Sequence, residues 1–266
     1  MKTENAHDVI DGYLQDLKLY AGKISPKFNM EDVHQFRTTT KKLRSLLRLH
    51  GFEKKILPKN FLHLYHIAGE LRNAQVLLVE FADHGTRLPG MYLWLATYIA
   101  GKQQQWKKHH PNRDVKQVKQ KIAAVNLVRP SIQELRSFFN DRLQEVHAIV
   151  SCAAPEDEAL HTARKRIKDL VYVKQWCKDA WPVGWNATRQ VSLISLKKLS
   201  DVAGDFNDRR VGMDLLALHL EQEEALKQKR AARRFEVSQR KDTANTKKEL
   251  IDALQKYSAR FAQPKD

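Results

Sequence analysis

Five polar side chains in one segment are spaced so that a helix would bring them together. They follow one another at steps of three and four residues and are His34, Arg37, Lys41, Arg44 and Arg48. At about 100° per residue, these steps place all five within an arc of roughly 80°. Such a helix offers a row of donors to an anion, although most charged helix faces are simply solvated.

A second segment repeats the start of this pattern. Residues 160–168 restate residues 33–41, with the histidine, the arginine and the lysine at the same spacing. The repeated residues are His161, Arg164 and Lys168, with Lys165 and Arg166 beside them. The positions that match Arg44 and Arg48 hold uncharged residues. We therefore expect the first half of the chain to contribute more to anion binding than the second.

Each copy is followed by a glycine four residues before an asparagine or aspartate. These pairs are Gly69 with Asn73 and Gly204 with Asp208, and Arg72 directly precedes Asn73. Internal repeats at this scale indicate duplicated structural units. Because duplicated helical halves usually pack about a pseudo-two-fold axis, we expect the two basic helices to meet in one composite site.

The charge of the chain indicates the kind of ligand. Its 266 residues include 47 Lys and Arg against 31 Asp and Glu, a formal net charge of +16 and a pI near 9.8. Cations that face one another repel unless an anion is present, and polyanions bind basic proteins strongly. Arginine forks and mobile lysines suit a flexible phosphate chain. A histidine beside phosphates should have a raised pKa, so binding should strengthen below neutral pH.

The apolar residues recur with helical rather than alternating periodicity, which predicts an all-α fold. Gly and Pro residues mark the ends of the segments. The expected helices cover about residues 4–22, 31–50, 57–85, 91–110, 114–123, 131–154, 155–181, 188–220 and a charged final stretch to about 261. The repeat divides them into two similar four-helix bundles, residues 1–125 and 126–266.

Several other features have simpler interpretations. Cys152 and Cys177 have no CxxC spacing and suit small core residues in a reducing compartment. The N-terminus has no apolar stretch, and the most apolar segment, 91–100, is too short to span a bilayer, so we expect a cytoplasmic protein with no membrane contact. His63 and His66 lack further ligands nearby, so we expect no metal site and no cofactor.

The duplicated His-x-x-Arg-x-x-x-Lys helix and the two Gly-x-x-x-Asx segments resemble the CHAD domain, the conserved-histidine α-helical domain, over about residues 4–257. The resemblance implies two similar four-helix bundles with a basic channel at their junction, which binds inorganic polyphosphate without catalysis. A cytoplasmic protein of this kind could associate with polyphosphate granules. The channel positions that it implies are His34, Arg37, Lys41, Arg44, His161, Arg164 and Lys168, with Arg48, Lys165, Arg166, Lys197 and Arg72 as additions.

Two alternatives stay open from the sequence. A general nucleic-acid binder would also be strongly basic and would bind with a steep salt dependence. A metal-dependent or phosphohistidine enzyme would use His34 or His161, but no carboxylate in the pattern orients either ring, and the sequence has no phosphate-cradling glycine loop, nucleophile elbow or HExxH motif.

Overall fold

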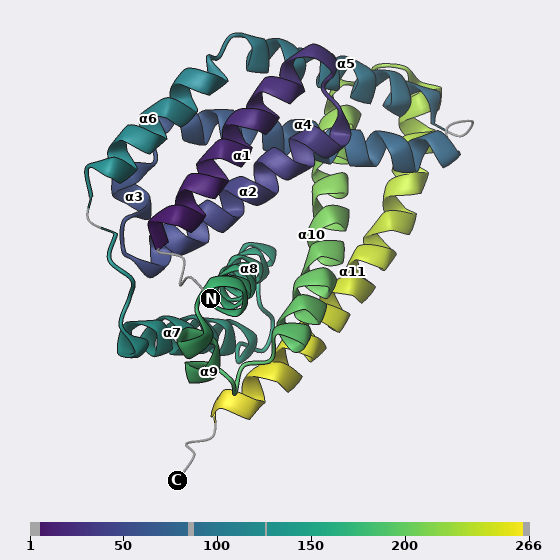
Figure 1. Ribbon diagram of the computed structural model, residues 1–266. Helices are drawn as coiled ribbons and strands as arrows, with labels where there is room; N and C mark the ends of the chain where they lie inside the picture. The colour runs from purple at the N-terminus through teal and green to yellow at the C-terminus, as the bar shows by residue number, and fades with distance from the viewer. Residues whose placement is uncertain (1–5, 85–87, 126, 263–266) are drawn as a thin grey trace.

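The computed structural model describes residues 6–84, 88–125 and 127–262, and every regular element in these ranges is an α-helix. Figure 1 shows their arrangement. The helices are α1 (Ala6–Lys27), α2 (Met30–Leu49), α3 (Glu53–Ile56), α4 (Lys59–His84), α5 (Pro89–Lys107), α6 (Pro111–Ala123), α7 (Ile132–Val150), α8 (Asp157–Ala180), α9 (Pro182–Ala187), α10 (Leu193–Gln222) and α11 (Leu226–Ala262).

Local sequence explains where the two basic helices and their neighbours begin and end. The side chain of Asn29 accepts a hydrogen bond from the Glu31 backbone N–H at 2.7 Å and caps the start of α2. Gly51, at φ 73°, takes the left-handed conformation just after α2, which glycine adopts without steric cost. Ser131 and Glu134 form a capping box at the start of α7.

The helices fall into two groups in chain order. Helices α1, α2, α4, α5 and α6 pack mainly on one another, and α7, α8, α10 and α11 form a ring in which each helix contacts the next. The groups meet where α2 crosses α8 and where α10 reaches α4 and α5 (Figure 1). The buried apolar side chains of both groups form one continuous cluster, so the two groups share a core.

The structure confirms the all-α prediction. The internal duplication, its pseudo-two-fold axis and the division at residues 125 and 126 stay predictions. No helix within the described ranges is both long and apolar enough to cross a membrane.

The stretch after α8 differs from the prediction. The sequence predicts one helix that ends at about 181 and another that begins at about 188, but a short helix, α9, begins at Pro182 and the next begins only at Leu193. The buried ammonium of Lys174 donates to the backbone carbonyls of Trp185 (3.0 Å) and Thr188 (2.7 Å) and so anchors the end of α9. This contact depends on packing, which local sequence does not reveal.

Candidate anion-binding site

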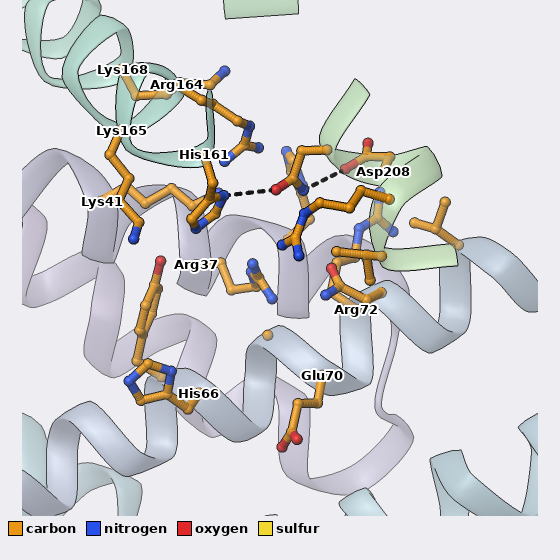
Figure 2. Close-up of a pocket in the computed structure, with 18 of the residues that line it drawn as sticks. Arg37, Lys41, His66, Glu70, Arg72, His161, Arg164, Lys165, Lys168 and Asp208 are labelled. Carbon is orange, nitrogen blue, oxygen red and sulfur yellow. Dashed lines mark hydrogen bonds between the residues drawn. The ribbon is translucent and has the colours of Figure 1, made fainter. Parts of the chain in front are cut away.

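A cavity of about 510 Å³ lies where the two groups of helices meet. Side chains from α2, α4, α8 and α10 line it, and Figure 2 shows many of them converging on the same space. Two helices come from each group, so the cavity exists only because the two groups pack together. This arrangement brings the two basic rows of the sequence into one site.

Most of the predicted site residues line this cavity. They are His34, Arg37, Lys41, Arg44, Arg48, Arg72, His161, Arg164, Lys165 and Lys168. The cavity lining does not include Arg166 or Lys197. Arg166 instead pairs with Glu145 of α7, and Lys197 is exposed on α10. Which of the lining residues contact a ligand stays a prediction.

Arg37 and Arg164 approach each other from α2 and α8, and both extend into the cavity (Figure 2). Arg37 Nη1 and Arg164 Nε are buried, and neither has a hydrogen-bond partner among the described residues. Burial first, and then the charge of Arg164, lowers the pKa of Arg37. A buried donor without an acceptor costs about 1–3 kcal/mol of stability, and more when the donor is charged. A ligand that supplies acceptors to these two nitrogens would therefore be stabilised.

Gly69 explains how Arg37 reaches this position. A Cβ atom at residue 69 would lie 2.6 Å from Arg37 Nη1. The guanidinium therefore occupies the space that the side chain of any residue other than glycine would fill at this position of α4. The guanidinium is also 5.8 Å from the ring centre of Tyr65. Gly69 and Tyr65 therefore fix the direction of Arg37.

Burial and nearby positive charges also act on two lysines of the cavity, Lys41 and Lys168. Burial first, and then the charges of Arg37 and Arg164, lower the pKa of Lys41 well below its ordinary value. Burial and then Arg164 also lower the pKa of Lys168. Burial and the surrounding cations therefore disfavour the cationic form of each lysine. An anion would relieve this repulsion, and both lysines would then bind protons more tightly.

The two histidines differ in their surroundings. His161 Nδ1 lies 3.0 Å from Asn207 Oδ1, the contact drawn as a dashed line in Figure 2. The amide oxygen can only accept, so Nδ1 carries the proton and donates it. Burial first, and then the charges of Lys165 and Arg164, lower the pKa of His161 to about 4. These surroundings therefore favour the neutral form of His161 at pH 7.

His34 is more open. Its side chain is exposed, and burial followed by the charge of Arg72 lowers its pKa. The sequence predicts a raised pKa for a histidine beside phosphates, whereas the protein's own surroundings lower both pKa values, through burial first and then through nearby cations. The predicted rise applies to the bound state alone.

Arg44 and Arg48 have carboxylate partners, which the sequence does not predict. Glu53 of α3 accepts from Arg44 Nε at 2.6 Å and from Arg48 Nε at 2.8 Å. Although burial raises the pKa of Glu53, its bonds to Arg48 and the charges of both arginines lower it, so Glu53 is ionised. Arg48 also pairs with the buried Asp169 of α8. These partners offset the extra charge of the first row, so the expected bias toward the first half is reduced.

Sequence reasoning missed several lining residues. Those with polar side chains are Ser45, Tyr65, His66, Glu70, Glu80, Asp169, Tyr172 and Arg210. Arg210 follows the Gly-x-x-x-Asx segment by two residues and was open to detection, and its buried Nε lacks a partner among the described residues. Asp169 follows the matched Lys168, but its burial depends on the crossing of α2 and α8. Nothing in the local pattern points to the two tyrosines.

The fold and the site define an all-α protein with a cationic cavity between two groups of helices, and comparisons with known proteins place it further. A family model described as the CHAD domain matches residues 9–217. The chain belongs to the CHAD domain family.

A solved structure supports the same fold. The crystal structure of the CHAD domain from the plant Ricinus communis is similar with a TM-score of 0.67 at 15% sequence identity, over 91% of this chain and 88% of that chain. No curated protein matches the sequence.

Proposed function

We propose that the cavity binds inorganic polyphosphate. The observation that carries the proposal is a pair of buried nitrogens, Arg37 Nη1 and Arg164 Nε, which have no hydrogen-bond partner among the described residues and belong to side chains that reach the cavity from α2 and α8. Charge-assisted hydrogen bonds to phosphate are roughly twice as strong as neutral ones, and arginine can make them in pairs. Membership of the CHAD family supports the same ligand class.

The shape of the site favours a bare phosphate chain over nucleic acid. Cations on walls from both helical groups surround the space, and a phosphate chain carries charge along its whole length. A duplex, whose major groove alone is about 12 Å wide, is too large for a cavity of about 510 Å³. Single strands stack bases on aromatic rings, but Arg37 and Arg44 already lie within 6 Å of the ring centre of Tyr65, at 5.8 and 5.2 Å.

We further propose that the site binds its ligand without catalysing its conversion. An activated histidine nucleophile or general base usually has a carboxylate that orients it, and the partner of His161 is the amide of Asn207. Within the described ranges, no group of three or more His, Cys, Asp or Glu side chains is placed to hold a metal ion. Phosphate release from polyphosphate by the pure protein would contradict this part of the proposal.

Calorimetric titration with polyphosphates of increasing chain length tests the binding. Arg37→Glu and Arg164→Glu should each weaken the Kd more than about tenfold, equivalent to about 1.4 kcal/mol, because each reversal places a like charge beside the ligand. The matched control is Lys197→Glu, the same charge change on an exposed residue outside the cavity lining, which should alter the Kd less than about twofold. Equal Kd values for all three variants would rule out the composite site.

A further inference from the structure

The last helix, α11, is a second basic feature, separate from the cavity. It begins after residue 217, where the family match ends, and follows the outer side of α10 (Figure 1). Its fully buried apolar residues lie mostly near its end, at Leu250, Leu254 and Tyr257, whereas Ala232 is the single one in the described stretch before residue 250. The stretch from 227 to 248 therefore buries little and leaves a long face open.

Seven exposed cations gather on that open face. They are Lys227, Arg230, Arg233, Arg234, Arg240, Lys241 and Lys248. At about 100° per residue they fall within an arc of roughly 140°, and at 1.5 Å per residue they extend over about 32 Å. The two carboxylates between residues 227 and 248, Glu236 and Asp242, fall outside this arc. Glu236 pairs with Arg240 at 2.7 Å, and Asp242 lies 3.9 Å from Arg209 of α10. We call these seven residues the α11 ridge.

The ridge has cations along both of its margins. Arg233 and Arg240 lie on one margin, Lys227 and Arg234 on the other, and the remaining cations lie between them. A helix with its side chains is about 10–12 Å across, and the major groove of a duplex is about 12 Å wide with a row of phosphates on each side. The two margins of the ridge therefore match the two phosphate rows that border a groove.

The ridge suits a duplex better than a flexible chain. It is convex, so it contacts a ligand from one side only, whereas the cavity surrounds a phosphate chain. Its arc carries no aromatic side chain for stacking single-stranded bases, and Val237, 69% exposed, is the one large apolar side chain that α11 exposes among its described residues. We propose that the α11 ridge binds the phosphate backbone of double-stranded nucleic acid, independently of the cavity.

Fluorescence anisotropy with a labelled duplex, measured at several salt concentrations, tests this proposal. The variant Arg230→Glu/Arg234→Glu/Lys241→Glu should bind at least tenfold more weakly, and the slope of log K against log salt should become shallower by about three, roughly 0.9 for each phosphate that is no longer neutralised. The matched control makes the same charge change on exposed residues of α6, as Arg113→Glu/Lys116→Glu/Lys121→Glu, and should keep the wild-type slope.

Further variants distinguish a loss of binding at the ridge from misfolding and from an effect on the cavity. The glutamine version of the ridge variant should show a smaller loss of the same kind, and its affinity for polyphosphate should stay at the wild-type value. Arg37→Glu should retain duplex binding even if polyphosphate does not bind the cavity, so the two proposals fail separately. The ridge proposal is overturned if the ridge and α6 variants lose duplex affinity equally, if the wild type does not bind the duplex, or if the ridge variant loses binding only to vesicles of anionic lipid.

Discussion

The two walls of the cavity start from the same sequence pattern and reach different electrostatic states. On the wall from α2 and α4, His34 is exposed, and the nearby charge of Arg72 helps to lower its pKa. On the wall from α8 and α10, the residue that matches Arg72 is Asn207, and its amide oxygen accepts from His161. The duplicated histidine therefore lies near a cation on one wall and donates a hydrogen bond to an amide oxygen on the other.

The matched glycines of the two walls also differ in the space that surrounds them. Gly69 leaves the space that the guanidinium of Arg37 occupies, whereas a Cβ at Gly204 would meet nothing within 4 Å. The shared glycine is a steric requirement on the first wall only. Position in a repeat does not by itself assign a role.

The residue after the matched lysine separates the walls further. On α2 it is Lys42, whose ammonium lies 5.9 Å from the ring centre of Tyr13. On α8 it is Asp169, 1% exposed, which accepts from Ser45 of α2 at 2.7 Å and pairs with Arg48. One copy of the repeat therefore supplies the buried anion that joins the two helices at their crossing.

The largest expected effect comes from removing the buried carboxylate that distinguishes α8 from α2. Asp169→Asn should lower the free energy of unfolding by about 3 kcal/mol, because it removes the negative charge that pairs with the partly buried Arg48. Urea denaturation measures the change. Lys42→Gln, the matched substitution on α2, should change stability by less than about 0.5 kcal/mol. Similar losses for both variants would show that the crossing does not depend on the buried anion.

The histidine contrast predicts a pH dependence. Burial and nearby cations of the protein lower the pKa of His161 to about 4, and a bound anion should raise it toward its ordinary value near 6.5. The bound state then holds more protons, so affinity rises as pH falls. A return to 6.5 would strengthen polyphosphate binding about tenfold between about pH 8 and about pH 5.5. Calorimetry in buffers of different ionisation enthalpy measures the proton uptake.

Variants of the two histidines assign this dependence to one wall. His161→Phe should remove most of it, whereas His34→Phe should remove less, because His34 is the more exposed ring. A flat pH profile in the wild type, or an equal effect of the two variants, would contradict the proposed difference.

The glycine contrast should appear as a smaller effect on affinity. Gly69→Ala should displace the Arg37 guanidinium and weaken polyphosphate binding about fivefold, near 1 kcal/mol. Stability should change little, since the clashing atom is the end of a flexible side chain. Gly204→Ala places the same methyl group in open space and should leave the Kd unchanged. Equal Kd values for the two variants would mean that Arg37 does not need the position it occupies.

The smallest expected effect concerns the arginines that Glu53 neutralises. Glu53→Gln frees Arg44 and Arg48 from one negative charge and should tighten polyphosphate binding about threefold. The variant also tests whether these arginines contact the ligand at all. A weaker or unchanged Kd, with the fold intact by circular dichroism, would show that they serve the structure only.

The sequence by itself determined the helical fold and the family. Helical periodicity is local, so the spacing of His34, Arg37 and Lys41 fixes a shared face before any packing is known. Repetition of the same spacing at His161, Arg164 and Lys168 was enough to predict that both rows would enter one site, and both rows line the cavity.

The tertiary structure alone decided how each cation is used. It turned Arg166 toward Glu145, gave Arg44 and Arg48 the carboxylate of Glu53, and set the Arg37 guanidinium against Gly69. These outcomes depend on which helix faces cross, and distance in space is independent of distance in sequence. A spacing pattern shows which side chains share a face, but only packing shows which charges stay unpaired and able to hold an anion.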